Sequence, residues 1–169
     1  MDNRFIPDRR VLPSAIVGRS PGNQAAFSII ELMVVIAIVG VLLGVAVPAY
    51  QEYIEKNKNY ETIADLTAIA VEIESYYIEN NRLPISLTQI GRGSSLDQWG
   101  NPYEYLNIST VKGKGKLRKD KNLVPINTDF DLYSKGPDGR SVSPLTAKHS
   151  RDDIIRANNG GFYGVAEDY

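Results

Sequence analysis

The chain of 169 residues contains no cysteine and only one histidine. Without cysteine there is neither a disulfide framework nor a thiol metal site. Small exported domains often rely on such cross-links, so a chain of this kind needs a well-packed core or another staple. The histidine, His149, has no serine or cysteine partner pattern, and we expect it on a surface loop. No nucleophile–base pair, cofactor loop or catalytic metal constellation is evident, which argues against an enzyme.

An excess of either charge is also missing. Nineteen lysines and arginines against 20 aspartates and glutamates give a formal charge of −1, so no general preference for polyanions is expected. Positive charge gathers in one run, which consists of Lys112, Lys114, Lys116, Arg118, Lys119 and Lys121. Such a run suits a polyanion or an acidic neighbouring subunit. No aromatic residues interleave it, which argues against nucleic acid, and a solvated hairpin loop is the simpler interpretation.

Charge is almost absent between Phe27 and Val47, where Glu31 is the only charged residue among 21. A helix of this length spans roughly 30 Å, the apolar thickness of a bilayer. An acid inside a membrane span costs about 2.5–3.5 kcal/mol on insertion scales, so Glu31 is a candidate functional residue. The alternative is a plain anchor helix that tolerates one acid near its end. Pro48 follows the run and removes a backbone hydrogen bond, which predicts a kink or local melting there.

Residues 1–26 have a different composition, with four arginines against two aspartates and with three prolines. The positive-inside rule places this segment in the cytoplasm and sends the chain after Pro48 outward. The segment ends in Ala25-Ala26, small residues that suit a peptidase. In an ordinary secretory signal the cleavage site follows the apolar run, whereas here the small residues precede it.

The run Phe27-Ser-Ile-Ile-Glu31-Leu-Met-Val-Val-Ile-Ala-Ile38 resembles the prepilin signature of type IV pilins and type II secretion pseudopilins. The resemblance implies that an inner-membrane prepilin peptidase and methyltransferase cuts between Ala26 and Phe27 and methylates Phe27. The usual residue before the cut is glycine, and Ala26 stands in its place. It also implies that Glu31 of one subunit pairs with the terminal ammonium of a neighbour, so that both charges gain a partner on assembly.

The resemblance implies an α+β pilin fold, in which a long N-terminal helix packs on a small antiparallel sheet. Apolar residues recur at spacings of three and four beyond Pro48, and they are Leu66, Ile69, Ala70, Ile73, Tyr76 and Tyr77. We therefore predict one helix over about 28–80. The predicted domains are a cleaved leader at 1–26, a transmembrane and filament-core helix at 27–48, and a globular periplasmic domain at 49–169. The aromatic, glycine-rich tail from Ile154 packs either on this domain or on a neighbour.

Two later segments resemble major pseudopilins of type II secretion. One is Asp97-Gln-Trp-Gly-Asn-Pro-Tyr103, which matches their Asp-x-Trp-Gly-Asn-x-Tyr element. The other begins with a predicted strand, Phe130–Ser134, and continues through a tight Lys-Gly-Pro-Asp-Gly-Arg turn to an Asp-Asp pair. Alone, Asp-Gly turns and Asp-Asp pairs are usually structural, although oxygen-rich clusters suit Ca²⁺.

The second segment resembles the calcium loop of major pseudopilins. The resemblance implies a Ca²⁺ ion held by the side chains of Asp138, Asp152 and Asp153 and by the carbonyl of Leu132, with Ser134 as a further contributor. The connection from Ser141 to Arg151 is longer than usual in that family, which leaves the ligand set open.

Three functions follow as hypotheses. The first is a structural subunit of a type II secretion pseudopilus, a helical homo-oligomer that supports protein export. The second is a subunit of a type IV pilus used in adhesion, motility or uptake, and the third is a membrane-anchored enzyme. For the first two we expect a single-pass inner-membrane protein with its bulk in the periplasm. Its partners would be the prepilin peptidase, an inner-membrane assembly platform and minor pilin-like subunits, with no nucleic acid.

Overall fold

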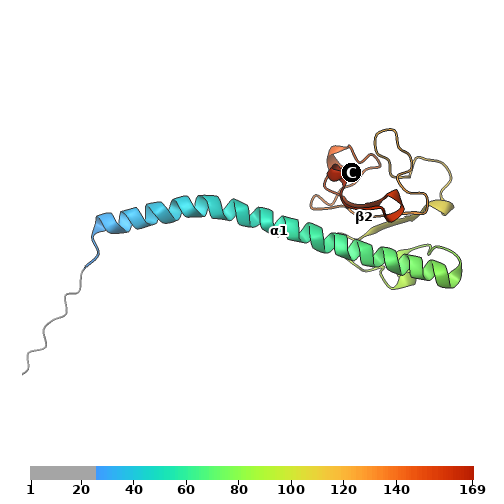
Figure 1. Ribbon diagram of the computed structural model, residues 1–169, viewed down its shortest axis with the longest axis horizontal. Helices are drawn as coiled ribbons and strands as arrows, with labels where there is room; N and C mark the ends of the chain where they lie inside the picture. Colours follow the sequence, from blue (N-terminus) through green and yellow to red (C-terminus); the bar gives the residue numbers. More distant parts are fainter. Residues whose placement is uncertain (1–25) are drawn as a thin grey trace, which may run out of the picture. The chain divides into compact units, whose positions relative to one another are not determined.

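The computed structural model describes residues 26–169, so the predicted leader, except for Ala26, lies outside the described residues. The chain forms two compact units that divide between Gly44 and Val45. Helix α1 (Ile29–Asn80) runs through both of them and is drawn from blue to green in Figure 1. These bounds confirm the predicted long helix. Asn81 ends it in the left-handed region at φ 52°, a conformation that asparagine tolerates.

Within the described residues, α1 is the one helix that is long and apolar enough to cross a membrane. The large apolar side chains from Phe27 to Val47 are between 46% and 85% exposed, so nothing else in residues 26–169 covers them. Pro48 lies inside α1, and the helix continues through it instead of melting there.

The second unit contains a four-stranded antiparallel sheet with the strand order β1-β2-β3-β4. Its strands are β1 (Glu104–Asn107), β2 (Phe130–Ser134), β3 (Ile154–Ala157) and β4 (Phe162–Val165). Strand β2 has the bounds that the sequence predicted. Strand β4 belongs to the glycine-rich tail and pairs with β3 from Val165 opposite Ile154 to Phe162 opposite Ala157. The tail therefore packs on its own domain.

The sheet has a buried cluster on each face. On one face α1 contributes Leu66, Ile69 and Ile73, which pack with Phe130, Leu132 and Ile154 of the strands. On the other face Ile155 packs with Ile126, Leu145, Ala157 and Ala166. Ile154 and Ile155 belong to different clusters because successive side chains of a strand point to opposite faces. The predicted α1 stripe is confirmed at its centre, while Tyr77 near its end is half-exposed.

Candidate assembly site and distal loop

The start of α1 is organised by two reciprocal hydrogen bonds between Ser28 and Glu31. The Ser28 backbone N–H donates to Glu31 Oε2 at 2.8 Å, and the Glu31 N–H donates to Ser28 Oγ at 3.3 Å. This is a capping box, which satisfies helix N–H groups that have no partner within the helix. Glu31 therefore has a role within its own chain. The Ser-x-x-Glu spacing is a sequence signal for this cap, but it was missed because Ser28 and Glu31 lie within the apolar run.

The residues of the predicted processing site precede this cap. Ala26 and Phe27 lie before the first residue of α1, and both are exposed. Phe27 has 85% of its surface exposed, so its side chain leaves the predicted cleavage site uncovered among the described residues.

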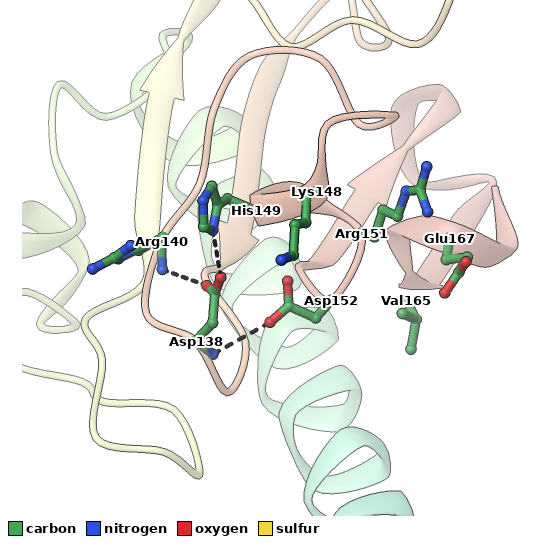
Figure 2. A pocket seen from close by; sticks show the side chains of 8 residues that line it. All are labelled: Asp138, Arg140, Lys148, His149, Arg151, Asp152, Val165 and Glu167. Atoms are coloured by element: carbon green, nitrogen blue, oxygen red, sulfur yellow. Dashed lines mark hydrogen bonds and ion pairs between the residues drawn. The ribbon is translucent and has the colours of Figure 1, made fainter.

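In the distal loop, which comprises residues 135–153 between β2 and β3, the structure brings Asp138 and Asp152 together. The Asp138 N–H donates to Asp152 Oδ2 at 3.2 Å, and Asp138 Oδ1 accepts from the Arg140 N–H at 2.7 Å. Asp138 Oδ2 lies 2.9 Å from His149 Nδ1, and Figure 2 shows the His149 ring and the Arg140 backbone nitrogen beside the Asp138 carboxylate, with the Arg140 side chain directed away. The hydrogen bond with His149 lowers the pKa of Asp138. His149 is partly exposed, as expected of a surface residue, but it lies in a short 3-10 helix (Lys148–Ser150) and not in an irregular loop, and it contacts an aspartate that was assigned to calcium.

The third predicted acidic ligand, Asp153, lies apart in the protein interior. Its side chain is fully buried, and its Oδ2 accepts from Arg118 Nη2 at 2.5 Å and from Ser141 Oγ at 2.5 Å. Its other oxygen, Oδ1, is buried without a hydrogen-bond partner. Burial raises the pKa of Asp153 to about 6, although the charge of Arg118 and the hydrogen bond from Ser141 act to lower it.

Ser134, the further residue predicted to contribute to calcium binding, also makes other hydrogen bonds. Its Oγ donates to Asp97 Oδ2 at 2.5 Å and accepts from the Gly136 N–H at 3.0 Å. Leu132 lies in β2 opposite Tyr105 of β1. Nowhere in residues 26–169 do three or more His, Asp or Glu side chains form a group that could hold a metal ion. Asp153 Oδ1 is unpaired, but the other side chains of the predicted set do not gather around it, so these residues do not fit the predicted calcium site.

The two segments that resemble pseudopilins contact each other. Asp97 accepts the Ser134 hydroxyl, and it also accepts the Trp99 and Asn101 N–H groups through Oδ1 at 3.0 and 2.7 Å. Asn101 Nδ2 in turn donates to the Gly136 carbonyl at 2.9 Å. Asp97 therefore holds its own turn closed and joins that turn to the end of β2.

Comparison with known proteins gives the family. Residues 21–47 match the prokaryotic N-terminal methylation motif. The chain is 30% identical over 148 residues to the type IV major pilin protein PilE of Neisseria gonorrhoeae, covering 82% of this chain and 85% of the relative. It is also 30% identical over 139 residues to the type II secretion system core protein G of Pseudomonas aeruginosa, covering 70% and 87%. No solved structure matched the chain.

The chain belongs to the type IV pilin-like superfamily. Its long apolar helix packed on a small antiparallel sheet confirms the predicted pilin-like α+β fold. An apolar helix that begins within a methylation motif makes the protein a membrane-anchored pilin-like subunit.

The basic run of this pilin-like protein is only partly the solvated loop that the sequence predicted. Lys112, Lys114 and Lys116 are exposed, but Arg118 is buried against Asp153. A second buried arginine, Arg156 of β3, donates from Nη1 and Nη2 to the two carboxylate oxygens of Asp129 at 2.9 and 2.7 Å. Sequence reasoning missed both pairs because the partners lie 35 and 27 residues apart and no local pattern links them.

Proposed function

We propose that this pilin-like protein is a structural subunit of a type II secretion pseudopilus, without enzymatic activity. It is held in the inner membrane by α1 with its second unit in the periplasm, and it assembles into a helical filament that supports protein export. The observation that carries the proposal is the contact of Asp97 with Ser134, because it unites the two segments that resemble major pseudopilins. Relatives named as core protein G, such as that of Dickeya chrysanthemi (29% identity, 89% of the relative), support the same function.

The second candidate is a subunit of a type IV pilus. It is favoured by a fimbrial protein of Neisseria meningitidis that is 40% identical over 121 residues, which cover 69% of each chain. Both functions require the same membrane helix and the same cleavage site, so α1 does not separate them.

A gene deletion with complementation separates the two functions. For a pseudopilus subunit, the deletion strain should retain export substrates in the periplasm while its surface pili and twitching motility persist. Loss of pili with normal export would assign the chain to a pilus. Complementation by the wild-type chain is the control in both assays.

Processing by the prepilin peptidase, contacts with an assembly platform and contacts with minor pilin-like subunits are part of this proposal. Their support is the methylation motif and the exposed Ala26–Phe27 bond. Calcium in the distal loop stays a prediction from the resemblance. Asp153 Oδ1 lacks a hydrogen-bond partner, but the buried guanidinium of Arg118 is a competing cation at the same carboxylate.

A further inference from the structure

We propose that Arg118 is the cation that closes the distal loop of this protein, in the role that family resemblance gives to calcium. The loop would then be held by a side chain of the same polypeptide, and the domain would stay folded without metal. This inference concerns the domain itself and holds for either kind of filament.

The guanidinium of Arg118 joins the residue before β3 to the start of the long connection. It donates through Nη2 to Asp153, the residue directly before β3, and through Nη1 to the Ser141 hydroxyl and the Val142 carbonyl, the latter at 3.1 Å. The Arg118 and Asp153 side chains are 5% and 0% exposed. A cation bound to carboxylate, hydroxyl and carbonyl oxygens is the arrangement that a hard metal ion would also adopt.

Two residues of β2 hold Arg118 in position. Its backbone N–H donates to Asp131 Oδ2 at 3.1 Å, and its guanidinium carbon lies 4.2 Å from the centre of the Tyr133 ring. Both partners belong to β2, so the arginine contacts the sheet as well as the loop. A preorganised guanidinium loses less freedom on pairing than a mobile lysine would.

The residues on either side of Arg118 also hydrogen-bond to the long connection. The Lys119 N–H donates to the Ser143 carbonyl at 3.1 Å, and the Leu145 N–H donates to the Lys119 carbonyl at 2.9 Å. The Ser143 hydroxyl donates to the Leu117 carbonyl at 2.7 Å. The connection after Ser141 therefore lies along residues 117–119, and its first two residues, Ser141 and Val142, supply the oxygens that the guanidinium contacts.

The buried carboxylate of Asp153 needs a cation nearby, so the stability of the folded domain depends on Arg118. Removing one member of a buried ion pair leaves the other charge uncompensated, which is strongly destabilising. Asp153 has Arg118 as this partner, while Ser134 and Asp138 are hydrogen-bonded to Asp97 and His149. The chain thus meets the charge requirement of Asp153 internally.

The first test is thermal unfolding of the wild-type full chain in detergent micelles, with chelator and with excess calcium. We expect the same midpoint in both conditions. An ion bound to the folded state at a hundredfold excess over its Kd would raise the midpoint by roughly 5–10 °C. A rise of that size would overturn the proposal and restore calcium to the loop.

The second test is a double-mutant cycle on Arg118→Met and Asp153→Asn. Arg118→Met should lower the midpoint by roughly 10 °C, whereas the matched variant Lys116→Met, an exposed lysine of the same run, should not change it. Adding Asp153→Asn to Arg118→Met should recover part of the loss, because no uncompensated charge is left. Strictly additive effects, or equal effects of the Arg118 and Lys116 substitutions, would overturn the proposal.

Hydrogen exchange measured by mass spectrometry tests where the effect occurs. In Arg118→Met, amides of residues 141–151 and 117–119 should exchange faster, while those of α1 from Leu66 to Ile73 keep wild-type rates. Faster exchange throughout the domain would show that Arg118 serves general packing and not loop closure. If Arg118→Met does not fold, the wild-type calcium titration still decides the proposal.

Discussion

Glu31 has two possible partners, one inside the chain and one outside it. Inside, it completes the capping box with Ser28 at the start of α1. Outside, the resemblance implies a contact with the terminal ammonium of a neighbouring subunit. A capping box needs only an acceptor oxygen, and glutamine supplies one as well as glutamate does. The pairing between subunits needs the negative charge.

This difference predicts that Glu31→Gln and Glu31→Ala both enter the membrane but assemble poorly. Glutamine keeps the cap and removes the charge, so any failure of Glu31→Gln reports on the pairing between subunits. Ser28→Ala is the matched control, because it weakens the helix start by about 1 kcal/mol and leaves the carboxylate intact. Membrane fractionation and electron microscopy of filaments provide the measurements. Normal filaments from Glu31→Gln would assign Glu31 to the helix start alone.

The predicted cleavage between Ala26 and Phe27 makes Phe27 the first residue of the mature protein. Mass spectrometry of the mature protein should find Phe27 at its amino terminus, one methyl group heavier than residues 27–169. A strain without the prepilin peptidase is the control, and there the chain should retain Met1. A mature wild-type protein that begins at Met1 would refute cleavage at Ala26–Phe27.

At the scale of elements, the ion pair of Arg156 and Asp129 ties β3 to the residue before β2. Burial raises the pKa of Asp129, but hydrogen bonds from Arg156 and from the Phe130 N–H outweigh it and lower the pKa below its ordinary value of 3.8. Because the pKa falls on folding, the stabilisation by this carboxylate is present above pH 3.8 and is lost as the pH falls through the lower folded value.

Arg156→Met should therefore destabilise the chain by about 3 kcal/mol near neutral pH, and by less in acid. Arg156 also lies 3.9 Å over the Phe130 ring, a contact that does not depend on pH. Chemical denaturation at a series of pH values measures the difference, with the exposed Arg140→Met as control. A difference that stays constant down to pH 2 would show that charge is not what the pair contributes.

The turn between β2 and the long connection depends on a glycine. Gly136 has φ 61°, and a Cβ atom there would lie 2.1 Å from the Asp152 carbonyl oxygen. Gly113 has a similar φ of 86° and no atom within 4 Å of its Cβ position, so Gly113→Ala measures the backbone strain alone. Gly136→Ala should be more destabilising than Gly113→Ala by about 1–3 kcal/mol in denaturant titrations. Equal losses would mean that the turn can move away from Asp152.

For the whole molecule, the sequence predicted what short-range patterns encode. The membrane helix, the stripe around Ile69 and strand β2 followed from periodicity and composition. Arg118 could not be separated from its neighbouring lysines, because its burial depends on Asp153, which lies 35 residues away. The calcium prediction included Asp153 but not Arg118, which pairs with it. Long-range pairing, and not local propensity, was the missing information.

The exposed apolar surface of the first unit has a consequence for mutants in cells. Both buried clusters lie in the second unit and contain no residue from 27–44, so we expect substitutions there to leave the packing of that unit intact. Leu66→Ala should cost about 2–5 kcal/mol and lower steady-state abundance through proteolysis. Val41→Ala, at a position 72% exposed, should leave abundance unchanged on immunoblots and reduce only filament yield. Genetic screens should thus recover two separable phenotypes, scarce subunits and abundant subunits that do not polymerise.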